Sequence, residues 1–318
     1  MSKIEKALGR ARNEKGLVVV GGSRERASEP GSQSRDLVTS GPGTELRSHA
    51  DSAAAIARMK EPSLRDKADL ALQRIIHPEI AENGTVQAFR EIRTRILQKT
   101  HCRNCVLMVT SVTGDSGSTF VATNLGVAFA FDAGKTALLV DCNLRNPGLQ
   151  QLFPGKTPLG LTDYLEKADL DVADIIHPIG IERLRVIPAG ARREIPSEYF
   201  TSTRMKQMLD NIRQRYAERF ILIDAPPMSE TADTQILAEL CDYILLVVPY
   251  GKVTDGQIQT CIQSIDSKKL LGVVFNNEPN LPPLDWMEMW RTSYTLLRDW
   301  LFKITRTIRN AACKDKAV

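Results

Sequence analysis

Short apolar runs alternate with helical patterns through the middle of the chain, and this alternation constrains the fold more than any other feature. The runs are rich in Val, Ile and Leu, and they span 105–111, 135–141, 184–190, 220–227, 242–251 and 270–277. Strands that are apolar along their whole length are typical of parallel sheets buried on both faces. The sequence therefore predicts an α/β fold with a doubly wound, mainly parallel sheet and helices on both faces.

The segments around this region differ in composition. Residues 1–16 and 284–318 are basic and show amphipathic helical patterns, whereas 17–62 is rich in Gly, Ser, Arg and Ala without a sustained period. We therefore expect an N-terminal helix, a flexible linker, an α/β domain over 63–283, and a C-terminal helix with a tail. The 42% hydrophobic and 25% charged residues fit a soluble globular protein, and a net charge of +4 is too small to indicate nucleic-acid binding.

The lack of an apolar targeting segment and the pattern of cysteines indicate the cellular compartment of the protein. No apolar run approaches the ~20 residues that span a bilayer, and the start of the chain lacks the apolar segment of a secretory signal. These features predict a cytoplasmic protein. The pair Cys102-x-x-Cys105 lacks a second ligand pair, and Cys105 begins an apolar run, which favours a structural role and reduced thiols.

Polar groups follow three of the apolar runs. The first run leads into the turn 111–119, and two others end in aspartate, at Asp141 in LLVDCNLRNP and at Asp224 in FILIDAPP. In a parallel sheet the carboxyl ends of the strands meet at one edge, and ligands bind there. We therefore expect these groups to lie together, where a magnesium nucleotide would be held.

The stretch TSVTGDSGSTFVATNLG has the outline of a phosphate-binding loop, which consists of a strand, a tight turn and a helix. Gly114 and Gly117 can shape the turn, and Thr119 occupies the magnesium-ligand position of such loops. Val112 stands where the pattern has its first glycine, and Ser118 stands where it has lysine. Alone, the stretch is as compatible with an ordinary strand–turn–helix corner, but the two strand-terminal aspartates favour a phosphate loop.

Several segments, in the right order, resemble one family. VQAFREIRTRIL, GLTDYLE, IPSEYF with the helix before FILIDAPP, and GVVFNN are similar to segments of the cytoplasmic bacterial tyrosine autokinases that accompany exopolysaccharide synthesis, in the MinD-like P-loop class. The resemblance covers about residues 85–280. The N-terminal SKIEKALGRARNE looks most like autokinases encoded with exosortase-type polysaccharide systems.

The resemblance implies roles for individual residues. The phosphates of ATP or ADP would be held by Gly114, Asp115, Ser116, Gly117, Ser118 and Thr119, with Asn276 near the base. Magnesium would be held by Thr119, Asp141 and Asp224, and Asp141 would be the catalytic acid of an active enzyme. Arg90 and Arg93 would contact the neighbouring subunit of a ring.

The chain departs from the family pattern at positions that matter for phosphoryl transfer. Ser118 replaces the lysine, Asn143 replaces a second aspartate, and Gln87 replaces a glutamate. The family's tyrosine-rich tail is missing, because Tyr294 is the only tyrosine beyond residue 250. Phosphoryl transfer depends on positioned charge, so these losses predict a pseudokinase. An active tyrosine autokinase is the alternative. A positioning ATPase of the MinD or partition (ParA) type is disfavoured by VQAFREIRTRIL and IPSEYF.

Nucleotide binding is a separate question from catalysis. The turn, the start of the following helix, Thr119 and the two aspartates remain, and they are compatible with weak binding of Mg-ADP or Mg-ATP. Alternatively, Ser118 and Asp115 cap the helix over an empty site, since both are good capping residue types. The sequence leaves both alternatives open.

A basic amphipathic pattern occupies the C-terminal segment. Apolar residues recur there at spacings of three and four, from Trp286 to Ile308, with Arg and Lys on the other faces. The segment packs on the core or on another subunit, or it lies on the anionic surface of the inner membrane, or it docks on a membrane partner. By the resemblance, the expected partner is a membrane chain-length protein (polysaccharide co-polymerase) or an active homologous kinase. We expect a homo- or hetero-oligomer and no nucleic acid.

Overall fold

The computed structural model of the chain describes residues 19–20, 56, 64–77, 84–101, 103–155, 158–216, 218–229 and 232–277. All of them belong to one compact unit, Met1–Asn277. The helix predicted over 1–16 and the C-terminal helix predicted over 284–318 lie outside the described residues. Among the helices that are described, none combines the length and the apolar character needed to cross a bilayer.

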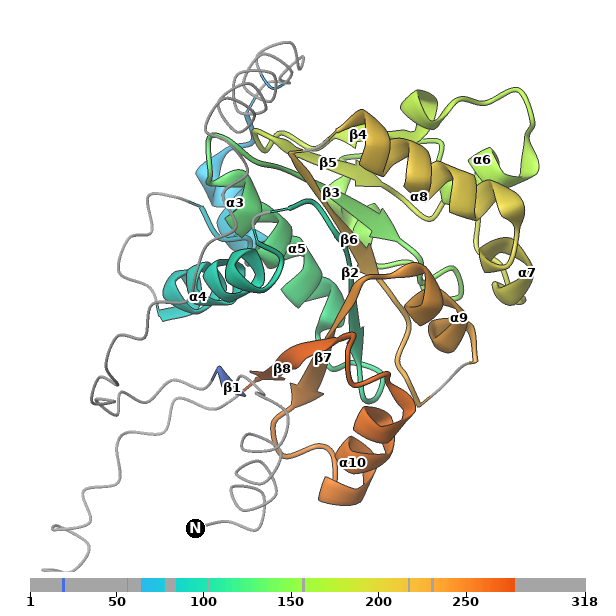
Figure 1. The fold of residues 1–318 in the computed structure, drawn as a ribbon. Helices are drawn as coiled ribbons and strands as arrows, with labels where there is room; N and C mark the ends of the chain where they lie inside the picture. Colours follow the sequence, from blue (N-terminus) through green and yellow to red (C-terminus); the bar gives the residue numbers. More distant parts are fainter. Residues whose placement is uncertain are drawn as a thin grey trace, which may run out of the picture. The chain divides into compact units, whose positions relative to one another are not determined.

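One sheet of eight strands runs through this unit, in the order β1-β8-β7-β2-β6-β3-β5-β4 (Figure 1). The strands are β1 Val19–Val20, β2 Val106–Ser111, β3 Thr136–Asp141, β4 His177–Pro178, β5 Leu184–Ile187, β6 Arg219–Asp224, β7 Tyr243–Pro249 and β8 Leu270–Asn276. Neighbouring strands are parallel except β4, which pairs antiparallel with β5. The prediction of a mainly parallel α/β sheet is confirmed. β1 falls in the range predicted as a linker and extends the sheet beside β8.

Helices cover both faces of this sheet (Figure 1). The described helices are α3 Lys67–Leu72, α4 Gly84–Lys99, α5 Ser118–Ala130, α6 Leu161–Glu166, α7 Ser197–Phe200, α8 Thr203–Arg215, α9 Asp233–Leu240 and α10 Asp255–Ser264, with the 3-10 helices η1 Leu149–Leu152 and η2 Val172–Ile175. The buried residues of α3, α4 and α5 join the core on one face. Those of α6, α7, α8, α9 and α10 join the core on the other face.

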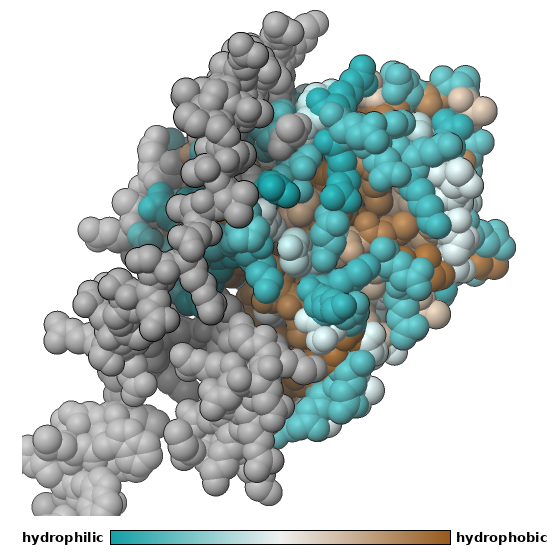
Figure 2. All heavy atoms as spheres, viewed as in Figure 1, coloured by the Kyte–Doolittle hydropathy of each residue, from teal (hydrophilic) through white to brown (hydrophobic). Residues whose placement is uncertain are grey.

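Successive side chains of each strand point to opposite faces of the sheet, and this explains why the apolar runs are continuous. In β3, Ala137 and Leu139 belong to the core on the α5 face, whereas Leu138 and Val140 belong to the core on the α8 face. Successive side chains point to opposite faces, and both faces are covered, so nearly every position along the strand is apolar. Hydrophilic side chains accordingly dominate the outer surface seen in Figure 2, with smaller hydrophobic areas between them.

The third predicted strand is longer than the strand observed. The pattern predicts 184–190, but β5 ends at Ile187. Beyond it the chain passes close to the start of α6, because a Cβ added to Gly160 would lie 2.3 Å from the Pro188 carbonyl oxygen. Gly190 adopts a φ of +80°, which ends the extended conformation and suits glycine.

Helix α4 is the helix that resembles the subunit contact of the autokinases. Its Arg93 donates from Nη1 to the Ala128 carbonyl of α5 at 2.9 Å. Arg90 lies over the Phe131 ring, 5.8 Å from the ring centroid. Both arginines therefore contact the end of α5 in their own chain, and their contact with another subunit stays a prediction.

Candidate nucleotide site

Three strand ends meet at one edge of the sheet. β2, β3 and β6 are neighbours and run parallel, and Asp141 lies opposite Asp224 in the register of β3 and β6. Asp224 also lies opposite Val109 near the end of β2. The predicted grouping of both aspartates with the turn after β2 is therefore confirmed.

The turn between β2 and α5 is held by its own residues and by β8. Ser116 is buried, and its hydroxyl donates to the Thr113 carbonyl at 2.6 Å. The Asn276 side-chain amide donates to the Ser116 carbonyl at 2.9 Å. Gly117 has a φ of +82°, and a Cβ there would lie 2.2 Å from the Asn276 amide nitrogen, so glycine is required. Asn276 thus holds the turn itself, and its contact with a base stays a prediction.

Helix α5 begins at Ser118 without a side-chain cap. Gly117 is the N-cap residue, and no side-chain oxygen bonds to the first turn. The capping alternative is therefore wrong, because Ser118 is already inside the helix and Asp115 lies ahead of the cap. Gly114 and Asp115 are exposed at the tip of the turn. Uncapped first-turn N–H groups, at the positive end of the helix dipole, favour an anion at this position.

Two buried carboxylates and a hydroxyl lie beside the turn. Thr119, in the first turn of α5, donates its hydroxyl to the Asp224 carboxylate at 2.7 Å. Asp141 accepts three backbone N–H groups from the loop that follows it, at 3.1, 3.0 and 2.9 Å. That loop packs directly on α5, because a Cβ added to Gly148 would lie 2.8 Å from the Thr119 hydroxyl oxygen. The structure thus brings together the residues predicted to hold magnesium.

Burial dominates the electrostatics of the two aspartates. Asp141 and Asp224 are 0% and 1% exposed. Burial raises the pKa of Asp141 to about 6, against the opposing effect of its three N–H bonds. Burial, and then the nearby charge of Asp141, raise the pKa of Asp224 well above its usual range. A divalent cation would stabilise both charged forms.

The donor set fits magnesium. Hydroxyl and carboxylate oxygens are the ligands that Mg²⁺ prefers, and Mg²⁺ usually keeps waters and phosphate oxygens in the rest of its shell. Among the described residues no cluster of three or more His, Cys, Asp or Glu side chains forms a complete metal cage. Thr119, Asp141 and Asp224 would therefore hold magnesium together with the nucleotide, either directly or through water.

The loop after β3 contains one of the departures from the family pattern. The Asn143 side-chain oxygen accepts the Asn146 N–H at 3.2 Å, so this side chain closes a turn within the loop. Arg145 pairs with Asp233 at the start of α9, at 3.2 Å. At the position of the family's second aspartate, this chain thus has an uncharged side chain that is hydrogen-bonded within its own loop.

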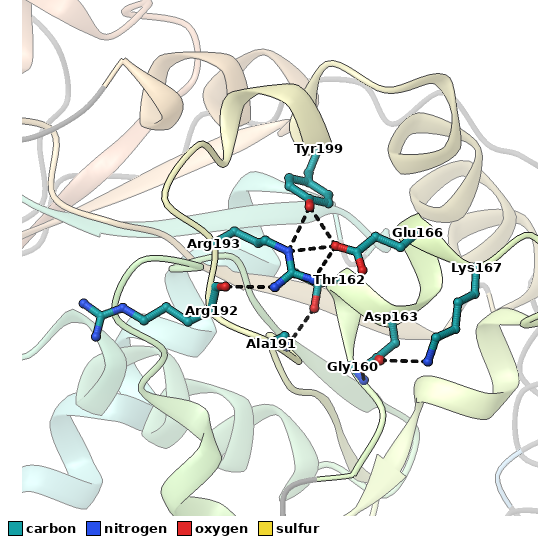
Figure 3. Close-up of polar contacts among 9 residues, drawn as sticks. All are labelled: Gly160, Thr162, Asp163, Glu166, Lys167, Ala191, Arg192, Arg193 and Tyr199. Atoms are coloured by element: carbon teal, nitrogen blue, oxygen red, sulfur yellow. Dashed lines mark hydrogen bonds and ion pairs between the residues drawn. The ribbon is translucent and has the colours of Figure 1, made fainter.

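A polar cluster over the loop after β5 was not predicted from the sequence. Figure 3 shows Arg193, Glu166 and Tyr199 pointing toward one another from that loop, α6 and α7. Arg193 Nε donates to Glu166 at 2.7 Å and to the Tyr199 oxygen at 2.9 Å, and the Tyr199 hydroxyl donates to Glu166 at 2.7 Å. The backbone N–H of Arg193 donates to the Leu144 carbonyl at 3.0 Å, and this bond connects the loop after β5 to the loop after Asp141. Because separate elements supply the cluster, no regular spacing marks it.

Solved structures define the class of protein. The crystal structure of the chimerical protein CapA2B2 matches with a TM-score of 0.59 at 26% identity, covering 73% of this chain and 100% of that chain. The BceF tyrosine kinase domain matches with a TM-score of 0.56 at 28% identity, covering 69% and 92%. The fold is that of a bacterial tyrosine kinase domain of the P-loop type.

The chain belongs to the bacterial tyrosine-protein kinase family, as the resemblance predicted. It is 30% identical over 195 residues to the tyrosine-protein kinase CpsD of Streptococcus agalactiae serotype III, covering 60% of this chain and 82% of CpsD. It is also 30% identical over 212 residues to the putative tyrosine-protein kinase EpsB of Ralstonia solanacearum, and there it spans only 28% of the relative's length. No family model matches the chain.

Proposed function

We propose that the chain is a tyrosine-autokinase-like regulator of exopolysaccharide synthesis or export, with a degenerate Mg-ATP site and little or no kinase activity. One observation carries the proposal. Helix α5 begins beside the two aspartates of the family, but with Ser118 at the lysine position. The whole stretch TSVTGDSGSTFVATNLG holds no Lys or Arg. The link to polysaccharide rests on the sequence resemblance.

The missing charge affects catalysis more than folding. Phosphoryl transfer relies on positioned positive charge around the transferred group. Removing one preorganised donor from a comparable site slows a reaction about 10²- to 10³-fold. Asn143 adds to this loss, because a neutral side chain engaged in its own turn cannot act as a base. The chain beyond residue 250 also offers one tyrosine, Tyr294, in place of a cluster of acceptors.

Weak binding of Mg-ATP or Mg-ADP is part of the proposal. The uncapped first turn of α5 offers N–H groups to phosphate. Thr119, Asp141 and Asp224 offer oxygens to magnesium. The exposed carboxylate of Asp115, at the tip of the same turn, repels phosphate and lowers the expected affinity.

A regulator without kinase activity acts through assembly. The family resemblance supplies the partner classes, which are a membrane chain-length protein (polysaccharide co-polymerase) and an active homologous kinase. Helix α4, with Arg90 and Arg93, is the proposed contact with another subunit in a homo- or hetero-oligomer. The basic segment 284–318 is the proposed attachment to the inner membrane, which would place the protein in the cytoplasm at the membrane periphery.

An active tyrosine autokinase is the second candidate, and one observation favours it. Asp141 and Asp224 remain buried opposite each other, with Thr119 bonded to Asp224. Two buried carboxylates are costly to keep, and such groups concentrate at functional sites. Retention of this pair supports a site that still holds a magnesium nucleotide.

Phosphotyrosine formation distinguishes the two candidates. The purified chain, incubated with Mg-ATP, should give little or no signal on an anti-phosphotyrosine immunoblot. Asp141→Ala supplies the background, and Ser118→Lys tests whether the missing charge is the cause. A strong signal from the native chain that disappears in Asp141→Ala would contradict the regulator proposal and support an active kinase.

A further inference from the structure

A cavity of about 270 Å³ lies beside the first turns of α5. Its walls are Thr119, Phe120 and Thr123 of α5, the residues 72–75 at and after the end of α3, and part of η1. Thr119 is shared with the candidate nucleotide site, so the cavity adjoins the position expected for magnesium and phosphate. Of the described residues that line the cavity, Arg74 alone is charged.

Arg74 has an uncommon backbone conformation. Its φ is +55°, in the left-handed region that residues other than glycine seldom adopt. This conformation ends α3, because the Ile75 N–H donates to the Leu70 carbonyl at 2.8 Å and the Arg74 N–H donates to the Ala71 carbonyl at 3.0 Å, as in the common helix C-terminal motif. The buried Asn124 side chain of α5 bonds the same segment, by accepting the Ile76 N–H at 2.8 Å and donating to the Arg74 carbonyl at 3.2 Å.

A second set of contacts joins the same segment to η1. Gln73 donates from Nε2 to the Gln151 carbonyl at 3.3 Å. Arg65 donates to the Gln73 side-chain oxygen at 2.8 Å, and also to the Leu152 carbonyl. The backbone that carries Arg74 is thus bonded to α5 on one side of the cavity and to η1 on the other. The fold therefore sets the place of this backbone relative to Thr119.

We propose that Arg74 supplies, at the outer phosphates of a bound nucleotide, the positive charge that Ser118 does not supply. The proposal rests on the Mg-nucleotide binding proposed above. A guanidinium stays charged and donates pairs of hydrogen bonds to phosphate oxygens, so it suits this role. The described residues engage the Arg65 side chain in structural bonds, whereas they form no ion pair or hydrogen bond with the Arg74 guanidinium.

Calorimetric titration with Mg-ATP and with Mg-ADP tests this role. Arg74→Gly is the sharpest variant, because glycine adopts a φ of +55° without strain and the fold should persist. We expect it to weaken Mg-ATP binding roughly tenfold and Mg-ADP binding less, since the lost contact is to the outermost phosphate. Arg74→Lys should recover part of the affinity. The exposed Arg103 provides the matched control, and Arg103→Ala should leave both affinities unchanged.

Combining Ser118→Lys with Arg74→Gly tests whether positions 118 and 74 neutralise the same phosphates. Ser118→Lys should strengthen Mg-ATP binding, and the effect of Arg74→Gly should shrink in that background, because two groups that neutralise the same phosphates are partly redundant. Equal Mg-ATP affinity of the native chain and Arg74→Gly would overturn the inference, and so would the absence of Mg-ATP binding by the native chain. Equal affinities would leave the proposed function standing, whereas absence of Mg-ATP binding by the native chain would also remove the weak nucleotide binding from it. The loss of kinase activity is tested independently by the phosphotyrosine immunoblot.

Discussion

The candidate nucleotide site contains buried carboxylates, which cost free energy to keep charged, and glycines packed closely against neighbouring side chains. Asp141 and Asp224 are buried carboxylates, and their raised pKa values record the free-energy cost of keeping them charged. Gly117 and Gly148 lie where a Cβ would meet Asn276 and Thr119. The buried carboxylates are therefore expected to cost stability, and this cost can be measured.

Replacing Asp224 by Asn should stabilise the protein at pH 8 and change little near pH 4. The folded state raises the pKa of Asp224 above its unfolded value, so the native protein loses stability as pH rises through the range in which the carboxyl ionises. Asn removes that charge and keeps an oxygen for the Thr119 hydroxyl. We expect a gain on the order of 1–3 kcal/mol in the free energy of unfolding, measured by urea denaturation at both pH values.

The exposed Asp210 of α8 serves as the control for this measurement. Asp210→Asn should shift the free energy of unfolding by a few tenths of a kcal/mol at either pH, roughly as for other surface substitutions. If Asp224→Asn were less stable than the native protein at pH 8, the cost assigned to the buried pair would be wrong.

Whole elements place the site, and the loops between them complete it. β2, β3 and β6 carry the turn and both aspartates to one edge of the sheet. The loops after β3 and β5 are tied together by the Arg193 N–H, and the Arg193–Glu166–Tyr199 cluster holds the second loop against α6 and α7 (Figure 3). The cluster is partly exposed, so its contribution to stability is modest.

Glu166→Gln should reduce stability at pH 7, and this loss should shrink as the pH is lowered toward 3. The Tyr199 hydroxyl bond, and then the Arg193 guanidinium, lower the pKa of Glu166. A lowered carboxylate pKa contributes stability above the unfolded pKa, and that contribution disappears as pH falls through the folded value. We expect a loss of under about 1 kcal/mol at pH 7, because the carboxylate is partly exposed. Urea denaturation at the two pH values measures it.

Glu198, on α7 and exposed, is the matched control for this cluster. Glu198→Gln should be neutral at both pH values. Equal destabilisation by Glu166→Gln at pH 3 and pH 7 would mean that the side chain acts by packing and not by its charge.

At the scale of the whole molecule, a nearly neutral α/β unit is combined with basic chain ends. The segment 284–318 is basic and has an apolar stripe, which is the composition of a helix that binds an anionic bilayer. The predicted helix lies outside the described residues, so the proposed membrane attachment rests on the sequence pattern alone.

The full chain should therefore sediment with vesicles that contain anionic lipid, and a chain lacking 284–318 should sediment much less. Attraction between basic side chains and the lipid surface is screened by salt, so binding of the full chain should also fall as ionic strength rises. Vesicles of neutral lipid supply the control. Equal sedimentation of the two chains would remove the membrane role of this segment.

From the sequence alone, the class of fold and the corner of the sheet that holds the site were both predictable. The apolar runs marked β2, β3 and β6 because strands buried on both faces leave almost no polar position. Asp141 and Asp224 were predictable because they end the apolar runs of β3 and β6, and Thr119 because it lies where the helix after β2 begins. The bonds from Thr119 to Asp224 and from Asn276 to the turn were not, because they join residues far apart in the chain.

Only the tertiary structure decided what surrounds Ser118. It showed that neither Ser118 nor Asp115 caps α5, and that Asn276 holds the turn from β8. It also placed Arg74 and Thr119 along the same cavity, with the Arg74 backbone bonded to a buried asparagine on α5. The sequence determined which charge the phosphate loop lacks, since that depends on the residue at one position. The place of Arg74, the proposed replacement for that charge, depends on how segments distant in the sequence pack together, and only the tertiary structure shows this packing.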